Sequence, residues 1–482
     1  MIVFDRELIE KCQTNAPRYT SYPTADRFSL DYSREVHLGR LNSLFSGELV
    51  HADDNKSKAV NNNDGLVNNT NEAVSLYIHI PFCNTLCLYC ACNKIITNDR
   101  TNIATYLTYL EKEIELYTQL INNSKKLKVI QLHFGGGSPS WMTIAEVKQI
   151  MQVIGKYFDM SIAQEIAMEI DPRHSNSDYI AGLRENGFNR VSIGLQDFDY
   201  KVQKTVNRVQ SFECCKNILD AAKAFGFSST NVDLIYGLPF QNLESFSTTI
   251  DKVLELAPAR IALFNYAHIP SIFMPQSRIK ESDLPSSMVK LDILQMSVEK
   301  LGRFGYKFIG MDHFALPDDE LAVALDDGSL QRNFQGYSTF ADTNMLSFGV
   351  SSIGFLGNSY YQNVKDLQSY YAMLDKDLLP IMRGIILSQD DLIRKHIISQ
   401  IMCQYSLTYA DIEQKFKLSF SDYFNVELQM LNDLAELGLV EMVSDRFSVT
   451  DKGRFLIRNV AVIFDKYIQL SKNSSKSYSK VI

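Results

Sequence analysis

Four of the eight cysteines in the 482-residue sequence fall close together, at Cys83, Cys87, Cys90 and Cys92. The first three follow the pattern C-x3-C-x2-C, directly after an apolar, strand-like run. Such clustering in a long chain favours metal or redox chemistry over a disulfide framework. A structural zinc site usually takes four protein ligands in paired arrangements, and no second such pair follows. Three thiolates instead suit an iron–sulfur cubane whose fourth iron stays open to another ligand.

Two further motifs follow the next two strand-like runs, FGGGSPS at 134–140 and MEIDP at 168–172. Consecutive glycines let the backbone approach a ligand closely, and Glu169 places a carboxylate at the end of a strand. Taken alone, the glycines also fit a tight turn and the carboxylate also fits a surface group. Their position next to the cysteine loop favours ligand binding.

The elements that would position these motifs alternate regularly from residue 75 onward. Strands are expected at 75–80, 129–134, 165–170, 190–195, 231–237 and 260–267, and helices at 100–120, 143–157, 177–186, 211–225 and 243–255. This alternation is typical of βα units around a parallel sheet. Six units are too few for a closed eight-fold barrel, so the sequence predicts an α/β fold with a partial, open (β/α)6 barrel. Ligands of such folds bind at the C-terminal ends of the strands.

The rest of the chain is less uniform. Helices are expected at 4–14 and 32–46, around the loop PRYTSYPT, whereas seven asparagines between residues 55 and 71 predict a disordered insertion. Residues 268–380 show little regularity apart from a helix near 286–303. Helices at 389–405, 409–417 and 421–438 and a hairpin at 440–449 resemble a winged helix. The predicted division is 1–46, an N-terminal helical arm and lid loop; 47–73, the insertion; 74–380, the catalytic domain; and 381–482, a mostly helical C-terminal domain.

Composition narrows the functional classes. The net charge is −8, with no basic excess of the kind that nucleic-acid binding requires, so we expect the winged-helix region to pack or to act as a lid. The sequence contains no run of 18 or more apolar residues, so we expect no membrane span. The N-terminal residues contain no apolar signal core. The sequence therefore predicts a cytoplasmic protein that binds neither nucleic acid nor a membrane.

The motifs together resemble the oxygen-independent coproporphyrinogen III oxidases, a family of radical S-adenosylmethionine (SAM) enzymes. The resemblance runs in order from about Pro17 to Ile482. It departs from the expected pattern at Tyr89, Ala91 and Ser138, where Phe, Gly and Thr are usual. The segments that carry it are YIHIPFCNTLCLYCACNK, QLHFGGGSP, MEIDPR, GFNRVSIGLQDF, VNRVQ, DLIYGLP, FNYAHIP, FIGMDHFALPDDEL, RNFQGY and GRFLIRN.

The resemblance implies decarboxylation of two propionate groups of coproporphyrinogen III to vinyl groups, giving protoporphyrinogen IX. It implies a [4Fe–4S] cluster on Cys83, Cys87 and Cys90 and two bound SAM molecules. The first SAM site would be formed by Tyr77, Tyr89, Gly136, Glu169 and Ile353, and the second by Gly137, Ser138, Gln196, Arg208, Asp233 and Ala267. From the residues alone, only Gln196 and Asp233 would be expected as polar ligands at strand ends.

Other roles follow with less support from the motifs. His79 and Cys92 are candidate catalytic residues, because both lie next to the cluster loop. Arg18, in PRYTSYPT, is expected to pair with substrate carboxylates, since Arg binds carboxylates in a bidentate fashion. The partners would be the porphyrinogen and an unidentified electron donor and acceptor, and the protein would act as a monomer.

Two alternatives remain open at this point. A haem-binding chaperone of the same superfamily is disfavoured by Cys92 and by the full-length C-terminal match. A non-catalytic iron–sulfur or zinc redox sensor with a DNA-binding winged helix is disfavoured by the glycine motif and the barrel pattern.

Overall fold

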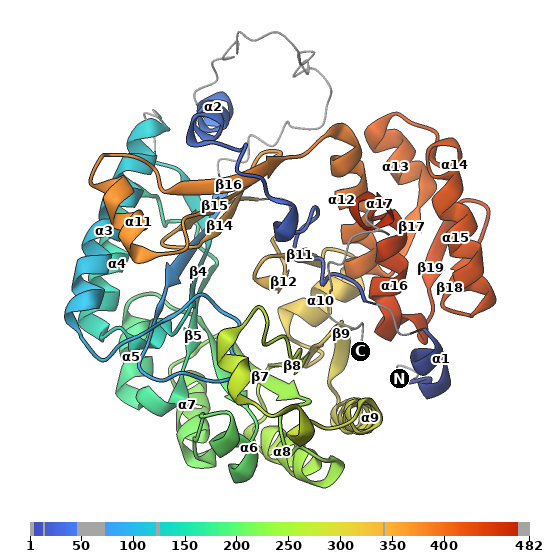
Figure 1. The fold of residues 1–482 in the computed structure, drawn as a ribbon, viewed down its shortest axis with the longest axis horizontal. Helices are drawn as coiled ribbons and strands as arrows, with labels where there is room; N and C mark the ends of the chain where they lie inside the picture. Colours follow the sequence, from blue (N-terminus) through green and yellow to red (C-terminus); the bar gives the residue numbers. More distant parts are fainter. Residues whose placement is uncertain (1–3, 13–14, 46–72, 122–125, 341–342, 471–482) are drawn as a thin grey trace.

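The chain folds around one large, curved sheet (Figure 1). The computed structural model describes residues 4–12, 15–45, 73–121, 126–340 and 343–470. The sheet has 12 strands in the order β16-β15-β14-β13-β1-β4-β5-β6-β7-β8-β10-β9. Of the predicted disordered insertion, residues 47–72 lie outside the described residues, and Ala73 already begins β1.

The middle of the sheet is the predicted partial barrel. Its six strands pair in parallel and in chain order, which confirms the predicted fold class. They are β1 (Ala73–Ile80), β4 (Lys128–Gly136), β5 (Glu165–Ile170), β6 (Arg190–Gln196), β7 (Ser229–Tyr236) and β8 (Arg260–Asn265). All six C-terminal ends therefore meet at one edge of the sheet.

Helices cover the outer side of these strands (Figure 1). The side chains of Thr143 and Glu146 form a capping box that fixes the start of α4, and Asn242 and Ser245 do the same for α8. Their apolar stripes pack with the strands into one continuous core. The helices are α3 (Thr101–Leu120), α4 (Ile144–Tyr157), α5 (Ser177–Glu185), α6 (Tyr200–Thr205), α7 (Phe212–Ala224) and α8 (Leu243–Leu256).

The region from 268 to 380 is more ordered than its sequence suggests, because it extends the sheet on both sides. Strand β13 pairs in parallel with β1, and β10 pairs antiparallel with β8. These strands are too short for a period of two to be visible in the sequence. The added strands are β9 (Lys307–Gly310), β10 (His313–Ala315), β13 (Asn344–Phe348), β14 (Ile353–Leu356), β15 (Ser359–Asn363) and β16 (Ile381–Ile386), and the helices of this region are α9 (Ser287–Arg303), α10 (Glu320–Asp327) and α11 (Leu367–Leu374).

The C-terminal region forms a second core beside the open side of the sheet (Figure 1). Its helices and small three-stranded sheet agree with the predicted winged-helix-like arrangement, with β17 added as a third strand. The elements are α12 (Gln389–Gln404), β17 (Ser406–Thr408), α13 (Tyr409–Phe416), α14 (Phe420–Tyr423), α15 (Asn425–Glu436), β18 (Val440–Met442), β19 (Arg446–Val449), α16 (Ile457–Ala461) and α17 (Lys466–Leu470).

The N-terminal segment connects the two cores. Between α1 (Arg6–Lys11) and α2 (Arg34–Phe45) it runs between the sheet and the C-terminal helices (Figure 1). The Tyr19 hydroxyl donates to Asp465 Oδ2 over 3.1 Å, on the C-terminal side. The predicted domain boundaries remain predictions. None of the described helices has the length and apolar character to cross a membrane.

Candidate active site

The cysteine loop leaves the C-terminal end of β1 and is held at several points. Strand β2 (Phe82–Cys83) pairs in parallel with β3 (Ile95–Ile96), which closes the loop on itself. Further along, the Leu88 N–H donates to the Val206 carbonyl over 3.0 Å. The loop is therefore fixed across the strand ends, between β1 and the segment that follows β6.

The three predicted ligands crowd together in this loop. Cys87 is buried, Cys83 and Cys90 are half-buried, and Cys92 is exposed. Burial, followed by the charges of Cys90 and Cys87, raises the pKa of Cys83 to about 12. A hydrogen bond from Cys92 lowers the pKa of Cys90 to about 6. Three thiolates here would repel one another, and bound iron would relieve that repulsion.

Two arginines add positive charge beside Cys87. Arg208 Nη1 lies 3.6 Å from Cys87 Sγ, and Arg173 Nη2 lies 3.8 Å from the same sulfur. Asp171 Oδ2 accepts from both groups, over 3.3 and 2.6 Å. Burial opposes ionisation of Asp171, but Arg208 and Arg173 outweigh it and hold the pKa of that carboxyl below its ordinary value.

This arrangement fits a cubane cluster better than a single metal ion. Among the residues that the structure describes, no three His, Cys, Asp or Glu side chains converge as ligands of one ion. A cubane does not need such convergence, because each thiolate binds a different iron. The loop of three cysteines with arginines beside it therefore fits a [4Fe–4S] cluster.

The glycine motif lets the end of β4 press against the end of β1. A Cβ at Gly137 would lie 2.5 Å from the Pro81 carbonyl oxygen, and Gly136 has φ of 120°. A Cβ at Gly135 would lie 3.0 Å from Glu169 Oε1. Only glycine permits this approach. The motif thus brings backbone groups of β4 next to the cysteine loop, as a ligand-binding turn requires.

A chain of polar contacts lines the inner face of the sheet beside the loop. Tyr77 Oη lies 3.1 Å from His79 Nδ1, and His79 Nε2 lies 3.1 Å from the Asn93 carbonyl. The Tyr77 ring stacks on His133, whose Nε2 is 3.5 Å from Glu169 Oε1. Burial lowers the pKa of His79, so its imidazole is neutral. With Nε2–H donating to Asn93, the Nδ1 atom accepts from Tyr77.

Asp233 and Gln196 lie further along the same edge. Asp233 accepts from Asn231 Nδ2 over 2.8 Å and from Ser192 Oγ over 3.3 Å. Burial, and next the charge of Glu169, raises the pKa of Asp233 to about 6. Gln196 has φ of 70°, and its buried Oε1 has no hydrogen-bond partner among the described residues. A polar ligand at this edge would supply the missing donor.

The remaining predicted residues are spread around the rim. Ser347, which pairs with Tyr77 in the sheet, donates from Oγ to the Ile353 carbonyl over 2.7 Å. Gln276 Nε2 lies 3.2 Å from both the Tyr89 and the Ala267 carbonyl oxygens. Ser138 Oγ is 3.4 Å from Ser140 Oγ.

Sequence reasoning missed Asp171, Arg173 and Gln276 as parts of this site. The first two stand in the segment MEIDPR, but their partner Arg208 is distant in sequence. Arg18, expected to bind substrate carboxylates, forms an ion pair with Asp312 and lies 5.4 Å over the Phe264 ring.

Comparison with known proteins agrees with this geometry. The model of the radical SAM superfamily matches residues 77–253, and the model of the HemN C-terminal domain matches residues 387–456. Membership of that superfamily implies a [4Fe–4S] cluster and SAM as cofactors.

Full-length relatives are similar throughout. The oxygen-independent coproporphyrinogen III oxidase of Escherichia coli K12 is 44% identical over 481 residues, covering 100% of this chain and 99% of the relative. The enzymes of the same name from Pseudomonas aeruginosa and Helicobacter pylori 26695 are 42% and 40% identical. The solved E. coli structure, described as a radical SAM enzyme, superimposes with a TM-score of 0.86 over 97% of this chain and 99% of that chain. The chain therefore belongs to the family of oxygen-independent coproporphyrinogen III oxidases.

Proposed function

We propose that this chain is a radical SAM decarboxylase that converts two propionate groups of coproporphyrinogen III to vinyl groups, giving protoporphyrinogen IX. The observation that carries the proposal is the juxtaposition at one sheet edge of the three-cysteine loop, the glycine turn of β4 and Glu169. Family membership supports coproporphyrinogen III as the substrate.

Cys83, Cys87 and Cys90 would hold the cluster, and Tyr77, Tyr89, Gly136, Glu169 and Ile353 the first SAM. When bound, these cofactors would supply the radical chemistry that takes a hydrogen atom from the β-carbon of a propionate, so that loss of carbon dioxide and of one electron to an acceptor leaves a vinyl group.

The protein's own groups orient the cofactors and control local charge. Arg173 and Arg208 place two guanidinium groups beside Cys87, because each lies within hydrogen-bonding distance of its sulfur. His79 is a positioning residue, since both ring nitrogens are engaged. Cys92 would serve turnover without being a cluster ligand.

A second SAM would bind through Gly137, Ser138, Gln196, Arg208, Asp233 and Ala267. Gln196 at the end of β6, Asp233 within β7 and Arg208 after α6 support this placement, because Arg208 and Asp233 offer opposite charges to a zwitterionic ligand. We further infer that the protein acts as a monomer in the cytoplasm, with an electron donor and acceptor still to be identified.

The test is an anaerobic reaction of the reconstituted, reduced protein with SAM, coproporphyrinogen III and an added one-electron acceptor. Protoporphyrinogen IX and 5′-deoxyadenosine should both form. Formation of 5′-deoxyadenosine with unchanged coproporphyrinogen would contradict the proposed substrate. Absence of both 5′-deoxyadenosine and protoporphyrinogen IX would contradict the proposed radical SAM activity.

A further inference from the structure

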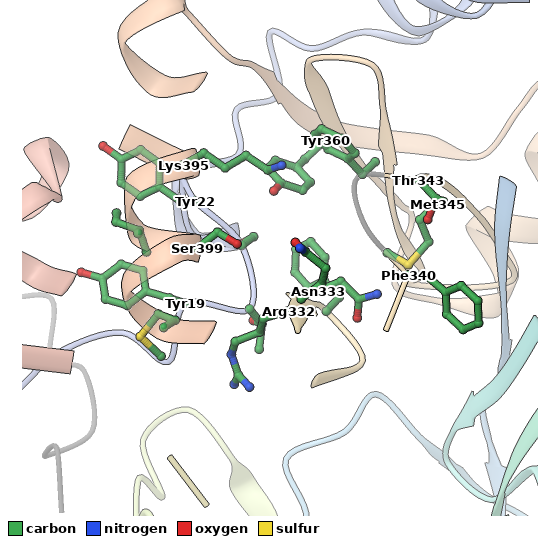
Figure 2. Close-up of a pocket in the computed structure, with 17 residues that line it drawn as sticks. Tyr19, Tyr22, Arg332, Asn333, Phe340, Thr343, Met345, Tyr360, Lys395 and Ser399 are labelled. Atoms are coloured by element: carbon green, nitrogen blue, oxygen red, sulfur yellow. The ribbon is translucent and has the colours of Figure 1, made fainter. Parts of the chain in front are cut away.

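A pocket lies on the inner face of the sheet, beyond β1 (Figure 2). One wall is formed by Met345 and Phe355, on strands that continue the sheet beyond β1. Opposite them stand residues 19–22 and Ser399 of α12. The floor is a hairpin of β11 (Gln331–Asn333) and β12 (Gly336–Ser338). The pocket thus adjoins the strand that leads to the cluster loop.

Its lining combines aromatic surface with positive charge. Phe334, Phe355 and Tyr360 contribute rings, and Arg332 and Lys395 contribute the two cations. No carboxylate stands among the described lining residues. The cavity, of about 80 Å³, is too small for a whole tetrapyrrole, but its size and lining fit one side chain that carries a carboxylate.

Arg332 is the least satisfied of these polar groups. Its Nε and Nη1 atoms are buried and have no hydrogen-bond partner among the described residues. The guanidinium instead lies over the Tyr337 ring, 4.6 Å from its centroid. A buried cation without an acceptor is costly, and an arginine fork is shaped to receive a carboxylate.

Neighbouring groups make the corner of the pocket around Arg332 strongly positive. Burial, followed by the charges of Arg332 and Arg18, lowers the pKa of His313 well below its ordinary value. Burial is the main cause that lowers the pKa of Arg458, and the charge of Arg332 adds a smaller effect in the same direction. Asp312 neutralises Arg18 by direct contact. The corner therefore gathers several arginines around Arg332, which attracts an anion.

The same corner faces the reaction edge. His313 pairs with Ala262, and Ala262 pairs with Asp233, so the three side chains share one face of the sheet. Phe264, beneath Arg18, lies on that face as well. In Figure 2, Arg332 projects from the hairpin away from Lys395 and Tyr360. Arg332 is linked to this face, because its guanidinium lies over the Tyr337 ring and that ring contacts His313 edge to face.

We propose that this pocket receives one propionate side chain of the tetrapyrrole and that Arg332 binds its carboxylate. The assignment rests on the proposed function for the identity of the tetrapyrrole. The propionate bound is one that is not reacting, because a fixed ion pair with the reacting carboxylate would stabilise the ground state against loss of carbon dioxide.

Binding of coproporphyrin III, the stable oxidised porphyrin with four propionates, tests the assignment by fluorescence titration of the full-length protein. Arg332→Gln should weaken binding about 10-fold to about 100-fold, the effect of losing a charged hydrogen bond. Its KM for coproporphyrinogen III should rise accordingly. Arg332→Lys should lie between, and Arg303→Gln, a well-exposed arginine on α9, should match the wild type. Cluster absorbance and SAM cleavage without substrate should not change.

A second ligand and a second variant separate carboxylate binding from a general loss of the pocket. The tetramethyl ester of coproporphyrin III lacks carboxylates, so its binding should be weak and insensitive to Arg332→Gln. Ser399→Phe fills the pocket while keeping Arg332, and should also weaken binding if Arg332→Gln does not fold. Wild-type affinity and KM in Arg332→Gln, or in Ser399→Phe, would overturn the proposal. Failure of the wild type to convert coproporphyrinogen III would instead overturn the proposed function.

Discussion

The two sides of the inner face are built in different ways. On the cluster side, Cys83, Cys87 and Cys90 lie within one loop, and the glycines and Glu169 stand at the C-terminal ends of β4 and β5. On the pocket side, Arg18, Arg332 and Arg458 come from three distant parts of the chain. The first side is thus encoded in local motifs, whereas the second exists only after folding. The difference indicates that radical chemistry and substrate recognition can be impaired separately.

The largest effect is expected on the cluster side. Cys87→Ala should abolish the visible iron–sulfur absorbance and all SAM cleavage, because the cubane loses an iron ligand. Iron and sulfide content, measured together with absorbance, checks the outcome. Retention of a full cluster would contradict the ligand assignment.

Gly137→Ala should impair activity nearly as much as Cys87→Ala does. The new Cβ would lie 2.5 Å from the Pro81 carbonyl oxygen, so the backbone must shift. SAM binding should fall strongly in equilibrium dialysis. Gly155→Ala, on α4, meets nothing within 4 Å and is the matched control. It should retain activity and gain about 0.5–1 kcal/mol of stability. Equal behaviour of the two variants would show that the close approach of β4 to Pro81 does not matter for SAM binding.

Asp233→Ala should leave the cluster spectrum intact and weaken product formation by about 1.5–3 kcal/mol, the value of a charged hydrogen bond. SAM stoichiometry should fall from two molecules to one. Asp220→Ala, in an exposed pair with Lys216, should change neither quantity. One SAM in both the wild type and Asp233→Ala would show that Asp233 serves substrate or structure.

Cys92→Ser should have a smaller effect on assembly. Because three thiolates suffice for the cluster, its absorbance should persist, while porphyrinogen turnover declines. A loss of the cluster as complete as in Cys87→Ala would make Cys92 a ligand.

The smallest effect concerns the free energy of unfolding and comes from Glu113, on α3 at the outer side of the sheet. Glu113 accepts from Tyr370 Oη and Asn363 Nδ2, each over 2.6 Å, and burial raises its pKa from 4.5 to about 7. The folded state therefore holds a proton that the unfolded chain releases above pH 4.5. The stabilisation is present below that pH and is lost as pH rises through about 7, by about 1–3 kcal/mol. Denaturant titrations from pH 5 to 8 should show this decline, and Glu113→Gln should flatten it. An equal slope in Glu113→Gln would exclude Glu113 as its source.

The same contrast explains what the sequence could predict. The six parallel strands of the barrel were predicted to within two residues at each end, since their alternation with amphipathic helices is strong, whereas β16 was not predicted. Strands β9, β10 and β13–β15 are too short to show a period of two. Within the site, motif residues such as Glu169 could be proposed from their place at strand ends. Asp171, Gln276 and Arg332 were missed, because their roles depend on partners brought close only by tertiary packing.

The proposed activity couples SAM cleavage to propionate decarboxylation at one site. The most direct measurement is the ratio of 5′-deoxyadenosine to vinyl groups formed in one anaerobic reaction with coproporphyrinogen III. We expect one 5′-deoxyadenosine per vinyl group, and hence two per protoporphyrinogen IX. Steady production of 5′-deoxyadenosine with no vinyl product would contradict the proposed coupling.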